Sequence, residues 1–167
     1  MKIFIDMDGV IADMIVHIDT FFPRRISLDT EEVWWKYYGN ILHNVPFNAD
    51  FWANIPKTPE ADELMALAED FGEVCVHTSF MEKEGCIEGK VRWMKRWYPN
   101  VPFFVGSPGV KHFLSHTNSV LVDDKTSNVT EFLAEGGHAF LWPTPWNQMD
   151  TNVDRVELFN LFMRGIR

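Results

Sequence analysis

The chain has 167 residues, and its 24 acidic and 15 basic side chains leave a net charge of −9 at neutral pH. This length predicts one domain with a large buried core. The acidic balance argues against binding to duplex nucleic acid, which requires a basic face. The two cysteines are too few for a disulfide scaffold. No apolar run approaches the roughly 20 residues of a membrane span, and Asp6 lies where a secretory signal would be apolar, so we expect a cytoplasmic protein.

Short apolar runs alternate with longer amphipathic segments along most of the chain. Strands are predicted at residues 2–6, 73–77, 102–105, 119–123 and 138–142. Helices are predicted at residues 59–71, 83–98, 126–135 and 154–163. Strands that alternate with helices favour right-handed βαβ units, so we predict an α/β fold with a parallel five-stranded sheet flanked by helices.

Residues 14–58 interrupt this alternation, because they contain no clear buried strand. Short helices are predicted there at residues 14–22, 29–38 and 48–54. We therefore expect a core domain and a small helical cap, formed by residues 1–13 with 59–167 and by residues 14–58, respectively. Nine of the 24 aromatic residues lie between positions 21 and 52. Most should build the core of the cap, but one or two could stack on a substrate ring, and the candidates are Phe22 and Trp52.

The segment Asp6-Met7-Asp8-Gly9-Val10 directly follows the first predicted strand. Carboxylates at positions i and i+2 point to the same side of an extended chain, and they repel unless a cation separates them or one is protonated. Mg²⁺ suits such an oxygen site and leaves room for a substrate phosphate. One carboxylate could then act as a nucleophile and the other as a general acid and base. An Asp-x-Asp pair alone is more often a solvated turn, but the apolar strand before it favours the functional interpretation.

Polar side chains also follow two other predicted strands. Parallel sheets bind ligands outside the carboxyl ends of their strands. The hydroxyls of Thr78 and Ser79 could hold phosphate oxygens there, and Lys111 could neutralise a phosphate. Asp123 and Asp124 end a buried strand, where paired acids are costly without a cation. Taken singly, the hydroxyls fit an ordinary turn and the lysine fits a solvated surface, whereas together with Asp-x-Asp they predict a magnesium site.

These motifs in this order resemble the haloacid dehalogenase-like (HAD) phosphatase superfamily. The resemblance covers nearly the whole chain outside residues 14–58 and implies a Rossmann-like HAD fold with a small helical C1-type cap. It implies that Asp6 is the nucleophile and a metal ligand. Asp8 would be the general acid and base and would offer its backbone carbonyl to the metal. The residues that hold phosphate or Mg²⁺ in the family correspond here to Thr78, Lys111, Asp123 and Asp124.

A narrower resemblance is to the 5′(3′)-deoxyribonucleotidases. It rests on the segment 6–13, on Phe51-Trp52 with Ile55-Pro56, on Thr78-Ser79 and on Glu88-Gly89-Lys90-Val91-Arg92-Trp93. In that family a small helical cap carries aromatic side chains that contact the base and sugar. The resemblance implies a magnesium-dependent phosphomonoesterase that acts on nucleoside or deoxynucleoside monophosphates through an aspartyl-phosphate intermediate.

Other interpretations remain open at this point. The substrate could be a sugar phosphate or another small metabolite, or the 3′-phosphate of a nucleic-acid end. A non-catalytic HAD-fold binding protein is a further alternative, although the full set of acids and Lys111 disfavours it. Residues 85–91 mimic a phosphate-binding loop but lack its spacing and its hydroxyl residue. We expect a small phosphomonoester as the ligand, no membrane partner, and a homodimer as one possible assembly.

Overall fold

The computed structural model describes residues 1–22, 31–41, 43–147 and 149–166. The first two residues of the helix predicted at 29–38 therefore lie outside the described residues. Within the described ranges, no helix is long and apolar enough to cross a bilayer.

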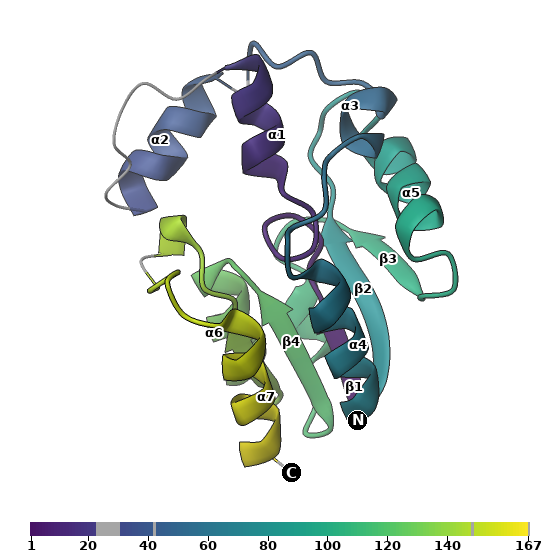
Figure 1. Cartoon of the computed structure of the whole chain (residues 1–167), viewed down its shortest axis with the longest axis vertical. Helices are drawn as coiled ribbons and strands as arrows, with labels where there is room; N and C mark the ends of the chain where they lie inside the picture. Colours follow the sequence, from purple (N-terminus) through teal and green to yellow (C-terminus); the bar gives the residue numbers. More distant parts are fainter. Residues whose placement is uncertain (23–30, 42, 148, 167) are drawn as a thin grey trace.

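A five-stranded parallel sheet forms the centre of the molecule (Figure 1). Its strands are β1 (Lys2–Ile5), β2 (Glu73–Ser79), β3 (Phe103–Gly106), β4 (Ser119–Asp123) and β5 (His138–Leu141). Their order is β3-β2-β1-β4-β5, so β1 is central and pairs with both β2 and β4. The α/β fold with a parallel five-stranded sheet is thereby confirmed. The carboxyl ends of β1, β2 and β4 consequently lie next to one another.

Helices cover both faces of the sheet. They are α4 (Ala61–Phe71), α5 (Cys86–Trp97), α6 (Thr126–Ala134) and α7 (Arg155–Gly165). Side chains alternate between the faces of a strand. Ile3 and Ile5 accordingly join the main core with residues of α4, α5 and α7, whereas Phe4 packs against Phe132 of α6 in a separate, smaller cluster.

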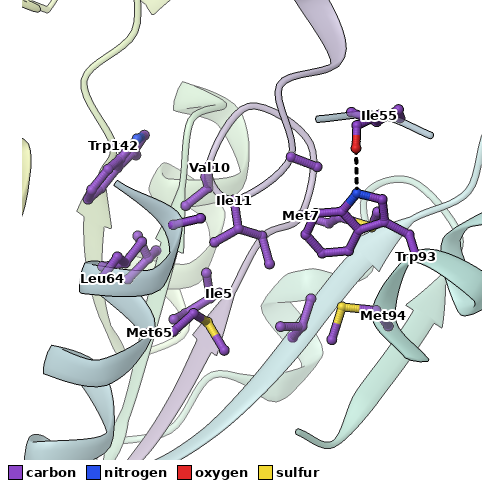
Figure 2. Packing of buried hydrophobic residues seen from close by; sticks show 14 of the residues in the cluster. Ile5, Met7, Val10, Ile11, Ile55, Leu64, Met65, Trp93, Met94 and Trp142 are labelled. Atoms are coloured by element: carbon purple, nitrogen blue, oxygen red, sulfur yellow. Dashed lines mark hydrogen bonds between the residues drawn. The ribbon is translucent and has the colours of Figure 1, made fainter. Parts of the chain in front are cut away.

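The loop after β1 is anchored by its apolar side chains. Met7, Val10 and Ile11 are fully buried, and Figure 2 shows them among side chains of α4 and α5. Trp93 of α5 also donates its indole N–H to the carbonyl of Ile55, at 2.7 Å (Figure 2). Because the apolar residues of this loop enter the core, Asp8, which lies between Met7 and Val10, is held half-buried at the edge of that core.

Three further helices lie beyond the carboxyl ends of the strands, while both chain termini lie at the opposite end (Figure 1). These helices, which we call the cap, are α1 (Met14–Phe21), α2 (Glu31–Ile41) and α3 (Ala49–Ala53). The two linkers to the cap run side by side, because Ala12 and Lys57 form an antiparallel bridge. The Asp13 amide donates to the carbonyl of Pro56, at 2.8 Å, and Thr58 donates to Ile11, at 3.0 Å.

Helix α5 begins at Cys86, three residues later than the sequence predicted. Gly85 caps it with a φ of 67°, and a Cβ there would lie 2.1 Å from the backbone nitrogen of Ala49. A Cβ on Gly89 would lie 2.3 Å from the Cβ of Trp52. The two glycines therefore permit a close approach between α5 and α3. The glycines that resemble a phosphate loop in the sequence act here as a helix-packing surface.

Strand β2 extends two residues further than predicted, through Ser79. The extension pairs with β3, because Thr78 and Ser79 lie opposite Val105 and Gly106. The hydroxyl residues that the sequence placed after the strand are thus held rigidly at its end. Two short 3₁₀ helices, η1 (Lys111–Leu114) and η2 (Pro145–Asn147), precede β4 and follow β5, respectively.

Candidate active site at the carboxyl edge of the sheet

A cavity of about 250 Å³ lies between the carboxyl ends of the strands and the cap. Its floor is polar and includes six of the predicted residues, which are Asp6, Asp8, Thr78, Ser79, Lys111 and Asp124. Its cap side is apolar, and the cap residues that line it are Met14, Ile15, Ile18 and Tyr38. Motifs that are far apart in the sequence therefore meet in one cavity, as the parallel topology requires.

Three buried carboxylates form a cluster at the floor. One oxygen from each of Asp6, Asp123 and Asp124 lies within 4.8 Å of the other two. Burial, reinforced by the charge of Asp6, raises the pKa of Asp123. Burial and the charges of Asp123 and Asp6 raise the pKa of Asp124 well above its usual value. Such crowding is unfavourable without a cation, and an all-oxygen donor set suits a hard divalent ion. The cluster therefore fits a divalent metal.

Lys111 lies against two of these carboxylates. Its Nζ is 2.7 Å from Asp6 Oδ1 and 2.6 Å from Asp123 Oδ2. Burial by itself would lower the pKa of Lys111, but the two carboxylates outweigh burial and raise that pKa. Lys111 is thus a buried, fully charged ammonium beside the predicted nucleophile, rather than a solvated surface lysine. Burial and the nearby charge of Lys111 lower the pKa of His77 to about 4, so that imidazole is neutral at pH 7.

The two aspartates of the β4 motif differ in their contacts. Asn128 Nδ2 lies 3.1 Å and 3.0 Å from the two carboxylate oxygens of Asp123, and the Lys125 amide donates to Oδ1 at 2.9 Å. With Lys111 on Oδ2, both oxygens of Asp123 are engaged. Among the described residues, the carboxylate of Asp124 accepts one hydrogen bond, from Trp146 Nε1 to Oδ2 at 2.6 Å. The carboxylate of Asp124 therefore has more lone pairs available to bind a metal ion than the carboxylate of Asp123.

Asp8 faces a different lysine. Lys90 of α5 donates from Nζ to Asp8 Oδ2 at 2.5 Å. The same ammonium donates to Thr78 Oγ1 and to the Ser79 carbonyl, both at 2.8 Å. In the described part of the chain, the other oxygen of Asp8, Oδ1, is buried and accepts no hydrogen bond. Asp8 lines the cavity, and the Lys90 ammonium holds its carboxyl group in place there.

The sequence analysis assigned no role to Lys90 or Trp146, although Lys90 lies in the segment 88–93 that carries the narrower resemblance. The signal for Lys90 is its position in α5, whose buried residues are Cys86, Gly89, Lys90, Trp93 and Met94. This spacing marks one face of a helix, and a lysine in the middle of an apolar face requires a buried partner. For Trp146 the sequence offers no comparable signal, because its partner Asp124 is 22 residues away and the loop between them has no regular period.

The aromatic residues predicted to contact the substrate do not line the cavity. Trp52 is fully buried, stacks on Phe47 at 5.1 Å between ring centroids, and donates its indole N–H to the carbonyl of Glu84. Lys90 Nζ lies 5.6 Å from the Trp52 ring centroid, so this tryptophan supports the lysine. Phe22 follows the end of α1 and is not among the residues that line the cavity. Ile15 and Ile18, from the same helix, do line it.

Comparisons with known proteins agree with this geometry. The family model described as "5′ nucleotidase, deoxy (pyrimidine), cytosolic type C protein" matches residues 1–161. Among curated proteins, no sequence matches the chain significantly.

Two solved structures are similar in fold. The HAD-hydrolase YfnB of Bacillus subtilis, determined with bound magnesium, has a TM-score of 0.62 at 10% identity, covering 97% of each chain. A HAD family hydrolase of Deinococcus radiodurans R1, with bound phosphate and sodium, has a TM-score of 0.55 at 14% identity. That comparison covers 99% of this chain and 96% of the other. At these identities the likeness establishes the HAD fold.

Proposed function

This chain belongs to the deoxy (pyrimidine), cytosolic type C 5′ nucleotidase family, and on that premise we propose that it hydrolyses deoxynucleoside monophosphates through an aspartyl-phosphate on Asp6. It is a phosphatase of the HAD fold that acts on nucleotides. One observation carries the proposed mechanism: the two acids line the same cavity but pair with different lysines. Asp6 contacts Lys111, and Asp8 contacts Lys90.

The first step is attack of an Asp6 carboxylate oxygen on phosphorus. The buried ammonium of Lys111 lies 2.7 Å from Asp6 Oδ1 and holds this carboxylate in position. As the new P–O bond forms, the bond from phosphorus to the ester oxygen breaks. Asp8, in its protonated form, donates its proton to that leaving oxygen. Asp8 lines the cavity, so its carboxyl group lies beside a bound ester for this transfer.

The second step returns both acids to their initial state. Asp8, now ionised, takes a proton from a water molecule, and that water attacks phosphorus. The bond between phosphorus and Asp6 breaks and inorganic phosphate leaves. Lys90 holds Asp8 and Thr78 with one ammonium, so the acid and the phosphate-binding hydroxyl keep a fixed separation during both steps.

Asp6 and Asp124 would hold the metal through their carboxylates, and Asp123 would orient the site. This assignment follows from the occupied oxygens of Asp123 and from the single hydrogen bond on the carboxylate of Asp124 among the described residues. We take the ion to be Mg²⁺, because carboxylate oxygens are its preferred ligands. When bound, it would offset negative charge on the phosphate oxygens. The Asp8 backbone carbonyl is a further candidate ligand.

The apolar cap side of the cavity supports a nucleotide substrate. The phosphate would lie on the polar floor, so the sugar and base would extend toward Met14, Ile15 and Ile18. Apolar walls favour a flat ring over a polyhydroxylated sugar phosphate. The family's description names deoxy and pyrimidine compounds and a cytosolic location, and we extend all three to this chain. The homodimer stays a prediction that light scattering would test.

The proposal is tested by release of inorganic phosphate in the presence of Mg²⁺. The substrates are 5′- and 3′-nucleotides of both sugars, sugar phosphates and a 3′-phosphorylated oligonucleotide. We expect selective release from deoxynucleoside monophosphates and none from the Asp6→Asn variant, with Asp150→Asn, at an exposed position, as the control. Release from sugar phosphates alone would be compatible with the proposed mechanism but would refute a nucleotide as the substrate. Turnover by folded Asp6→Asn would refute the assignment of the nucleophile.

A further inference from the structure

Two consecutive residues of η2 hold Asp124. Trp146 donates its indole N–H to the carboxylate, Nε1 to Oδ2, at 2.6 Å. Asn147 donates from Nδ2 to the backbone carbonyl of the same aspartate at 2.9 Å. One short 3₁₀ helix, reached only after β5, therefore contacts both the side chain and the main chain of a candidate metal ligand.

The segment that carries Trp146 is itself tightly held. Asn147 also donates to the carbonyl of Trp142 at 2.8 Å, and its Oδ1 accepts the amide of Thr144 at 3.1 Å. The Trp142 amide in turn donates to the carbonyl of Asp123 at 2.9 Å. These bonds connect the end of β5 to η2 and to the end of β4. The indole of Trp146 is thus presented from a fixed backbone and not from a free loop.

The carboxylate of Asp124 is also confined by packing. A Cβ on Gly9 would lie 2.3 Å from Asp124 Oδ2 and 2.9 Å from the Trp146 ring. Gly9 has a φ of 82°, a conformation that glycine adopts readily. The missing side chain lets the first motif, the Asp124 carboxylate and the indole approach one another closely. Oδ2 lies between the indole N–H and the Gly9 backbone, so rotation of the carboxylate would break a hydrogen bond or create a clash.

We propose that Trp146 is a positioning residue for the metal, because its indole N–H fixes the orientation in which Asp124 binds a divalent cation. The proposal rests on the proposed function in one respect, which is that Asp124 is a ligand. Partners that orient metal ligands commonly change metal affinity by 10- to 100-fold when they are removed. Without the indole N–H, the Asp124 carboxylate would lose its one side-chain hydrogen bond among the described residues.

The test is direct Mg²⁺ binding by isothermal titration calorimetry to the purified, metal-free protein. Trp146→Phe removes the N–H and keeps an aromatic ring. We expect its Mg²⁺ affinity to fall about tenfold and its turnover to recover when Mg²⁺ is raised by the same factor. The matched control is Trp142→Phe, because the indole nitrogen of Trp142 is buried and has no hydrogen-bond partner among the described residues. That variant should bind Mg²⁺ as the wild type does.

Two further variants separate the possible outcomes. Trp146→His restores an N–H donor and should recover part of the affinity, and it serves if Trp146→Phe does not fold. Asp124→Asn should abolish binding. If Asp124→Asn binds Mg²⁺ normally, the metal site of the proposed function is refuted. If Asp124→Asn fails to bind while Trp146→Phe and Trp146→His both bind as the wild type does, only the role of Trp146 is refuted.

Discussion

The carboxyl edge of the sheet and the cap bury very different side chains within a short distance of each other. At the edge, Asp6, Asp123 and Lys111 are buried charges, each with a charged partner from another element. In the cap, Phe51 and Trp52 are buried rings in contact with each other, at 5.2 Å between centroids. The edge therefore holds charged groups in fixed positions, whereas the cap packs apolar side chains and lines the cavity with one face of α1. Mutations should separate these two roles.

The largest effect should come from the acid that the proposed chemistry uses twice. We expect Asp8→Asn to lower kcat by about 10²- to 10⁴-fold, the usual contribution of a general acid and base. The amide is close in size to the acid, but the buried Lys90 would lose its countercharge, so the thermal midpoint should also fall and kcat is compared at a temperature where the variant is folded. Phosphate release and calorimetric unfolding are the measurements. Wild-type turnover by Asp8→Asn would remove this residue from the mechanism and leave the edge without a proton donor.

The next effect concerns the buried charges at the edge. Lys111→Met should lower the free energy of unfolding by about 3–5 kcal/mol, because Asp6 and Asp123 would each lose a buried countercharge. Lys95→Met, at an exposed position of α5, is the control and should change stability by less than about 0.5 kcal/mol. Urea denaturation of the metal-free proteins provides the comparison. Equal stabilities of the two variants would mean that Lys111 does not stabilise the acidic cluster.

A pH effect of slightly smaller size should arise at His77. Its pKa is lowered from 6.5 to about 4 by burial and by Lys111. Between these values the unfolded chain binds more protons, so acidification favours unfolding. The stabilising contribution is full above pH 6.5, and by pH 4 about 3 kcal/mol of it should be lost.

Comparison with a variant isolates this contribution from that of the nearby carboxyls. The stability of His77→Gln, measured by urea denaturation from pH 7 to pH 4, should fall about 3 kcal/mol less than that of the wild type. The matched control is His43→Gln, at an exposed position, which should follow the wild type. Parallel curves for all three proteins would contradict a neutral, buried His77.

The smallest effect should come from the cap face that lines the cavity. Ile15→Ala should raise the KM for a deoxynucleotide by about three- to tenfold with little change in kcat, because it removes apolar contact area far from the reacting atoms. The neighbouring Val16→Ala, on an exposed position of the same helix, should leave both constants unchanged. Initial-rate kinetics distinguish the two. A fall in kcat with unchanged KM would show that α1 acts on the chemistry and not on binding.

The sequence was sufficient to predict the sheet and the acidic edge. Apolar runs that end in acids are local patterns, and parallel topology brings their ends together, as Asp6 and Asp123 illustrate. The position of Lys90 was harder to predict, because it depends on which face of α5 meets the sheet. The ring contacts of Trp52 depend on neighbours such as Phe47, and local composition does not distinguish a ring that faces other rings from one that faces a ligand.

The bridge between Ala12 and Lys57 has a consequence for how this fold can be altered. The chain leaves the core and returns to it at adjacent backbone positions, so the length of the intervening segment places no strain on the sheet. Two antiparallel positions of this kind can be joined by a turn of about two residues. We therefore expect that the segment between these positions can be replaced by an insert of another length without disturbing the sheet, so that the same acidic edge would face a cavity of another shape.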